Sequence, residues 1–168
     1  NCKSIILAAT ANGRILSISS KWRIFKRDLG FLIAGLMQFL GRDIVTRGTS
    51  YPGYRQGLIG ASDLAGKRLP QPRVTQDGEK RLLDELLGNG FCLILKSPQD
   101  GYEIDRVKTE LDAKVVVIGI DFDDKEGVLA KFMGAATALL CRPDKYVFDA
   151  GDDAGQLCAA LMQRLQAG

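Results

Sequence analysis

The segment Ala138-Leu139-Leu140-Cys141-Arg142-Pro143-Asp144-Lys145-Tyr146-Val147-Phe148 decides the fold of the C-terminal part of this chain. Two apolar runs flank a charged tetrapeptide, residues 142–145, which is the pattern of a β-hairpin. Pro143 presets φ for a turn and has no N–H to donate, while the Asp144 side chain can bond to its own backbone. We therefore expect two antiparallel strands joined by a stiff, polar turn.

Strand and helix patterns alternate before this hairpin. Residues 91–96 and 114–120 are apolar runs with the composition of strands buried on both faces, and the spacing of Ile104, Val107 and Leu111 predicts a helix over 103–111 between them. Further predictions are a short strand at 71–76, a turn at Asp77-Gly78, helices at 80–87, 127–133 and 154–165, and Asp152 or Asp153 as the N-cap of the last helix. The order of these elements predicts an α/β fold with a thioredoxin-like mixed sheet flanked by helices. A parallel strand–helix–strand unit comes first, followed by a helix, an antiparallel hairpin and a final helix.

The N-terminal part has helical patterns only. One pattern covers residues 2–12 and is expected to end at Gly13, and a second covers 22–40, with Gly41 as its stop. Residues 48–60 contain Pro52 and four glycines without a regular period, which is typical of an extended linker. We therefore expect three parts: a helical segment at 1–45, a linker at 46–64 and the thioredoxin-like domain at 65–168.

Composition excludes several classes of protein. Hydrophobic residues make up 46% of the chain and charged residues 26%, which is ordinary for a globular domain. The net charge of +3 is too small to indicate nucleic-acid binding, and the basic cluster at 21–27 is interpreted as the polar face of a helix rather than a phosphate-contacting stripe. The longest apolar stretch, 29–40, is too short for a bilayer of about 30 Å. With no signal peptide visible, we expect a cytoplasmic protein that binds neither membrane nor nucleic acid.

The cysteines do not form a catalytic or metal-binding pattern. The chain has four, with no Cys-x-x-Cys pair, and it has no histidine, which excludes Cys/His zinc sites and His-based catalysis. Cys92 and Cys141 lie in neighbouring predicted strands, and we expect them to be buried, reduced and not bonded to each other. The junction after 91–96, where a thioredoxin enzyme needs its reactive thiols, reads Ser97-Pro98-Gln99-Asp100-Gly101 and holds none.

Two acidic clusters and the glycines are the remaining candidates for chemistry. Asp121-Phe122-Asp123-Asp124 and residues 149–153 lack the spacing of a calcium loop, so solvated loop carboxylates and helix caps are the preferred interpretation. Neither Gly-x-Gly-x-x-Gly nor Gly-x-x-x-x-Gly-Lys-Ser/Thr occurs. The sequence therefore gives no catalytic, cofactor-binding or metal-binding residue.

Three stretches resemble the C-terminal third of FAD-dependent aromatic monooxygenases of the 3-(3-hydroxyphenyl)propionate hydroxylase type. The stretches are Cys2-Lys3-Ser4 to Gly13-Arg14-Ile15-Leu16 with Lys21-Trp22 and Arg27-Asp28; Ala65-Gly66-Lys67-Arg68-Leu69-Pro70-Gln71-Pro72-Arg73-Val74 with Leu82-Leu83-Asp84 and Gly88-Asn89-Gly90-Phe91; and Arg142-Pro143-Asp144.

The resemblance implies that residues 1–45 close the catalytic region of a parent enzyme and that the rest is its C-terminal domain. FAD and NAD(P)H would then be bound by the parent, through residues that have no counterpart here, and this fragment would carry no cofactor. Its expected role is packing or subunit association, with the parent's catalytic region and a second copy in a homodimer as partners. The first residue, Asn1, suits an internal fragment. The alternative is a free-standing thioredoxin-like binding module without redox activity.

Overall fold

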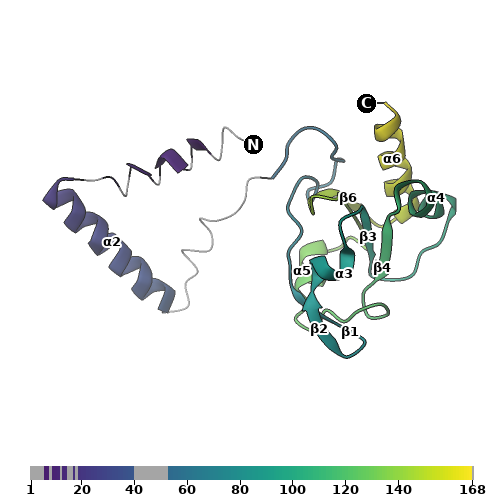
Figure 1. The fold of residues 1–168 in the computed structure, drawn as a ribbon, viewed down its shortest axis with the longest axis horizontal. Helices are drawn as coiled ribbons and strands as arrows, with labels where there is room; N and C mark the ends of the chain where they lie inside the picture. The colour runs from purple at the N-terminus through teal and green to yellow at the C-terminus, as the bar shows by residue number, and fades with distance from the viewer. Residues whose placement is uncertain are drawn as a thin grey trace. The chain divides into compact units, whose positions relative to one another are not determined.

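The computed structural model describes residues 6–7, 9–11, 13–14, 17, 19–39 and 53–167. The chain divides into two compact units, Asn1–Pro52 and Gly53–Gly168, which are described separately below (Figure 1).

The main described element of the first unit is helix α2 (Lys21–Phe39). Its start agrees with the predicted helix to one residue, and the expected stop at Gly41 lies outside the described residues. Seven large apolar side chains of α2 are exposed: Trp22, Phe25, Leu29, Phe31, Leu32, Ile33 and Leu36. The predicted end of the preceding helix at Gly13 is wrong, because Gly13 and Arg14 are themselves helical. A glycine inside a helix costs only about 1 kcal/mol relative to alanine, which need not end it.

A four-stranded mixed sheet forms the centre of the second unit. Its order is β4 (Lys114–Val117), β3 (Cys92–Leu95), β5 (Ala138–Cys141) and β6 (Val147–Gly151). β3 and β4 are parallel and connected through helix α4 (Tyr102–Leu111), whereas β3–β5 and β5–β6 are antiparallel. The sheet is therefore the mixed, thioredoxin-like one that the order of elements predicts, and the hairpin at residues 138–148 is confirmed.

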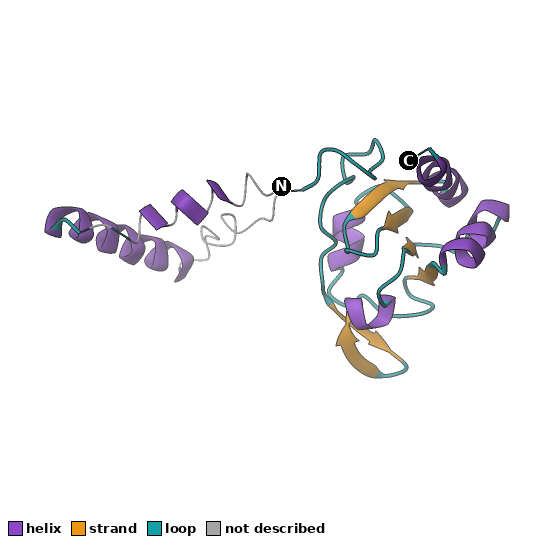
Figure 2. Cartoon of the chain, turned by 45° about the horizontal axis from the view of Figure 1, so that its top comes forward, coloured by secondary structure: helices purple, strands orange, loops and turns teal. Residues whose placement is uncertain are grey.

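Helices cover both faces of this sheet (Figure 2). Alternate residues of β3 point to opposite sides, so Cys92 and Ile94 pack with helices α3 (Leu83–Leu87) and α5 (Val128–Met133). Leu93 and Leu95 pack with α4 and with helix α6 (Ala154–Gln166). All four residues of β3 and all four of β5 are buried, as continuous apolar runs predict.

The structure corrects two predicted elements. Residues 80–82 are not helical, because strand β2 (Glu79–Leu82) pairs them with β1 (Arg73–Gln76), and only α3 follows. The turn at Asp77-Gly78 is confirmed, and both of its residues have positive φ, as a tight hairpin turn requires. The predicted strand at 114–120 ends at Val117, and only Val116 in it is buried, because β4 is an edge strand.

Residues 53–62, which we call the lead-in segment, belong to the second unit. The Gly60 N–H donates to the Phe148 carbonyl (2.6 Å), and the Tyr54 N–H donates to that of Gly66 (2.8 Å). The Gly66 N–H in turn donates to the Val147 carbonyl (2.8 Å). These bonds connect the segment to β6, the strand at the end of the sheet.

Candidate functional site

The junction between β3 and α4 is the position at which a thioredoxin-like enzyme needs its thiols. Here it is occupied by a hydrogen-bond network centred on Gln99. The Gln99 amide donates to the Asp152 carbonyl (3.1 Å), and its oxygen accepts from the Ala154 N–H (2.9 Å). Thr137 donates its hydroxyl to the same Asp152 carbonyl (3.0 Å). The junction therefore fastens the start of α6 to the sheet.

The predicted burial of the central cysteines is confirmed. Cys92 and Cys141 are fully buried and unbonded, and they lie directly opposite each other on β3 and β5. A hydrogen bond from the Cys141 thiol lowers the pKa of Cys92, and the same bond, with burial, raises the pKa of Cys141 well above its ordinary value. Cys158 is also free and buried, and burial raises its pKa to about 11.

The acidic cluster at residues 121–124 closes loops, as predicted. The Asp124 carboxylate accepts hydrogen bonds from three backbone N–H groups at the start of α5, those of Val128, Leu129 and Ala130. Asp121 accepts one from the Val117 N–H (2.6 Å). The described residues include no group of three or more acidic or cysteine side chains that could hold a metal ion.

The second acidic cluster differs in part from the prediction. Asp153 caps α6 by accepting from the Gln156 N–H (3.0 Å), as expected. Asp149, however, lies within β6, and its carboxylate accepts from the Ala61 and Ser62 N–H groups of the lead-in segment (3.2 and 3.0 Å). Burial opposes ionisation of Asp149, but hydrogen bonds from the Ser62 hydroxyl and from nearby N–H groups outweigh it and lower the pKa.

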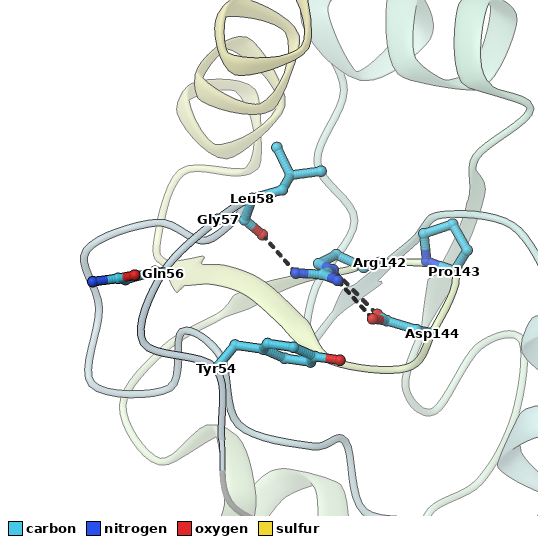
Figure 3. Close-up of a pocket in the computed structure, with 7 residues that line it drawn as sticks. All are labelled: Tyr54, Gln56, Gly57, Leu58, Arg142, Pro143 and Asp144. Atoms are coloured by element: carbon cyan, nitrogen blue, oxygen red, sulfur yellow. Dashed lines mark hydrogen bonds and ion pairs between the residues drawn. The ribbon is translucent and has the colours of Figure 1, made fainter. Parts of the chain in front are cut away.

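The tip of the central hairpin and the lead-in segment together line an open pocket of about 500 Å³ (Figure 3). Arg142 occupies it. Its guanidinium makes two bonds to the Asp144 carboxylate (3.1 and 2.6 Å) and donates to the Leu58 carbonyl (3.2 Å). It also lies 4.8 Å from the centre of the Tyr54 ring, which contacts Tyr146 edge to face at 4.5 Å.

This arrangement explains the Arg-Pro-Asp turn. Asp144 neutralises Arg142 and holds it in a fixed orientation, so the guanidinium can fasten Leu58 and Tyr54 from 84 residues or more away. The sequence analysis identified the turn but not these partners. The sequence signal was weak: Tyr54 is one of two tyrosines, with Tyr51, in a stretch otherwise typical of a linker.

No helix among the described residues is long and apolar enough to cross a membrane.

Sequence comparisons identify the relatives of the chain. One match is a probable NADH-specific resorcinol 4-hydroxylase of Rhodococcus jostii (strain RHA1), 35% identical over 130 residues, covering 70% of this chain and 24% of the relative. Another is a 3-(3-hydroxy-phenyl)propionate/3-hydroxycinnamic acid hydroxylase of Burkholderia cenocepacia (strain HI2424), 29% identical over 186 residues. This match covers 92% of this chain and 34% of the relative. The chain thus spans 24–34% of the length of these curated relatives.

Solved structures show the same fold. The flavin-dependent monooxygenase PieE, in complex with FAD and substrate, matches 91% of this chain and 31% of its own at 19% identity, with a TM-score of 0.59. Aklavinone-11 hydroxylase, in a ternary complex with FAD and aklavinone, matches 68% of this chain and 26% of its own at 24% identity, with a TM-score of 0.54. The family model of the HcaD C-terminal domain matches residues 66–167. The chain therefore belongs to the HcaD C-terminal domain family and matches the C-terminal part of FAD-dependent aromatic hydroxylases, as the resemblance of its sequence indicated.

Proposed function

We propose that this chain is the non-catalytic C-terminal part of an FAD-dependent aromatic-ring hydroxylase, where it serves packing and subunit association. The observation that carries the proposal is the exposed apolar face of α2, in a chain that spans at most 34% of its curated relatives. Leu32 is 70% exposed and Leu36 is 60% exposed. Burying one such side chain is worth about 1.5–3 kcal/mol, so a face of this size favours contact with other protein.

The parent enzyme would bind FAD and NAD(P)H outside this chain. A dinucleotide site needs a glycine loop that follows a strand and opens a helix, so that the helix N-terminus meets the phosphates. The glycine loop at 88–90 instead leads into β3, and the junction that does open a helix is occupied by Gln99. For this reason we propose that FAD is bound by residues outside this chain.

A titration tests this part of the proposal. FAD fluorescence is followed as the purified chain is added, and absorbance near 450 nm is recorded after gel filtration. We expect no retained flavin and no hydroxylation of phenolic acids with NADH or NADPH. Stoichiometric FAD binding at micromolar affinity or better would contradict the assignment.

The partners proposed for the α2 face are the catalytic region of the parent enzyme and, for the chain alone, a second copy in a homodimer. Size-exclusion chromatography with light scattering should report a dimer. The variant Leu32→Glu/Leu36→Glu should be a monomer, because each buried carboxylate would pay a large desolvation cost. Arg23→Glu, an exposed charge change on the same helix, is the matched control and should leave the dimer intact. A wild-type chain that remains monomeric at high concentration rejects the homodimer.

A free-standing binding module is the second candidate, because unit Gly53–Gly168 has core residues on both faces of its own sheet. The two candidates differ in the reading frame upstream of Asn1. A Gly-x-Gly-x-x-Gly motif encoded there supports the hydroxylase, and a nearby start codon supports the module. Cytoplasmic location and the lack of nucleic-acid partners remain part of the proposal for either candidate.

A further inference from the structure

β6 is the last strand in the order of the sheet, and residues 60–69, which we call the edge cover, lie along its outer edge. Four backbone hydrogen bonds join the two: from the Leu69 N–H to the Lys145 carbonyl (2.8 Å), from the Val147 N–H to the Lys67 carbonyl (2.9 Å), from the Gly66 N–H to the Val147 carbonyl (2.8 Å) and from the Gly60 N–H to the Phe148 carbonyl (2.6 Å). A fifth outward group, the Ala150 N–H, donates to the Ser62 hydroxyl (3.2 Å). The edge cover therefore does for β6 what a further strand would do.

The side chains at this edge are apolar on both faces of the sheet. Val147 belongs to the core beneath α3 and α5, and Phe148 belongs to the core beneath α4 and α6; both are fully buried. The edge cover adds Leu69, which is 2% exposed, to the first of these cores, and Leu64 packs against it. Without the edge cover, β6 would present unpaired backbone groups beside an apolar flank, and such an edge readily pairs with another chain.

A close backbone contact holds the edge cover in place. The Tyr54 N–H donates to the Gly66 carbonyl (2.8 Å), and a Cβ atom at position 66 would lie 2.0 Å from the Tyr54 carbonyl oxygen. Gly66 also has a φ of 73°, in the left-handed region that favours glycine. Any side chain at position 66 would therefore push the edge cover away from its present path, which gives a direct way to release it.

The opposite edge of the sheet, strand β4, is closed in a different way. The Val117 N–H donates to the Asp121 carboxylate (2.6 Å), and the Val117 carbonyl accepts from the Asp121 N–H (2.9 Å). Just before the strand, the Ala113 N–H donates to the Val107 carbonyl (3.2 Å) at the end of α4. Because these outward groups of the short strand β4 are bonded by loops next to it, β4 is a poor partner for an added strand.

We propose that the outer edge of β6 is a masked association site, which pairs with β6 of a second copy of this chain when the edge cover is released. Two identical edges that meet antiparallel about a twofold axis are self-complementary, so the outward N–H and carbonyl groups of one copy bond to those of the other. The closed edge at β4 leaves β6 as the partner strand. In the covered state the edge cover is an autoinhibitory contact, which restricts association to other surfaces such as α2.

The test uses the full chain with Leu32→Glu/Leu36→Glu, so that α2 does not contribute to association. This background chain is measured first by size-exclusion chromatography with light scattering, and a dimer at that stage counts against the role of α2 only. Gly66→Ala is then added and should convert monomers to dimers as the concentration rises. Gly78→Ala is the matched control and should stay monomeric, because Gly78 also has a positive φ (83°) but a Cβ atom there would have no other atom within 4 Å.

Amide hydrogen exchange identifies the surface that associates. In dilute Gly66→Ala the Val147 N–H should exchange faster than in the control, because it loses the Lys67 carbonyl, and it should slow again in the dimer. Far-UV circular dichroism confirms that each variant is folded. If Gly66→Ala does not fold, Asp149→Ala, which removes the acceptor for the Ala61 and Ser62 N–H groups, is measured in the same way. A folded variant that stays monomeric at high concentration overturns the proposal, and so does a dimer in which the Val147 N–H still exchanges fast.

Discussion

Replacing Arg142 with methionine tests the idea that this residue fastens the lead-in segment to the hairpin. Methionine keeps an unbranched stem but removes the guanidinium, so the bonds to Asp144 and to the Leu58 carbonyl are lost together with the contact to the Tyr54 ring. The side chain of Arg142 is only 18% exposed, so water cannot fully replace these interactions in the folded state.

The size of the effect follows from the individual contacts. A hydrogen bond from a charged group is worth about 1.5–3 kcal/mol, and a partly exposed cation–π contact about 0.5–1 kcal/mol. The ion pair with Asp144 adds little, because that carboxylate is 40% exposed and can be solvated. These terms overlap, so we expect Arg142→Met to lower the free energy of unfolding by about 2–3 kcal/mol.

Urea unfolding followed by circular dichroism measures this loss. With slopes of about 1–3 kcal/mol per molar urea, a loss of about 2–3 kcal/mol should lower the urea midpoint by about 0.7–3 M. Arg142→Lys keeps the charge but not the planar guanidinium, so its free energy of unfolding should lie between those of the wild type and Arg142→Met. Arg73→Met, at an exposed arginine of β1, is the matched control and should stay within about 0.5 kcal/mol of the wild type. If Arg142→Met also stays within that range, Arg142 does not fasten the segment.

Three further substitutions probe the hydrogen bonds that hold the loops. The pKa of Asp149 is lower in the folded state than its unfolded value of about 3.9, so its contribution to stability is present above that value and is lost as pH falls through the folded pKa. Asp149→Asn should therefore be less stable than the wild type at pH 7. Its urea-unfolding midpoint should also fall less steeply than that of the wild type as the pH is lowered from about 5 to 3. Parallel plots of midpoint against pH for the two proteins would contradict this. Asp124→Ala removes the acceptor for three N–H groups of α5 and should lower the free energy of unfolding by about 1–2 kcal/mol. Asp124→Asn should recover part of that stability. An unchanged urea midpoint in Asp124→Ala would reject the capping role. Gln99→Ala should speed amide hydrogen exchange at the start of α6, because the Ala154 N–H loses its acceptor; exchange at wild-type rates there would exclude that role.

Local patterns predicted most of the elements because they depend on residues close in the chain. The apolar runs of β3 and β5, the helical spacing of α4 and the turn at Asp77-Gly78 were all read from the sequence and are present in the structure. Two of the failures occurred where strand pairing decided the outcome. Residues 80–82 have helical spacing with the residues that follow, yet they form β2 because β1 lies beside them. The burial of β4 was overestimated because its composition does not reveal that it is an edge strand.

The sequence alone determined the fold class, the family resemblance and the lack of thiols at the β3–α4 junction, because each depends on residue order and type. The tertiary structure decided which distant groups meet. It placed Asp149 against Ser62, Arg142 against Tyr54, and Cys92 opposite Cys141. Such contacts depend on the register and direction of strands, and a shift of one residue in register would turn every side chain of a strand to the opposite face. No local pattern carries that information, so the fastening of the lead-in segment emerged only from the folded chain.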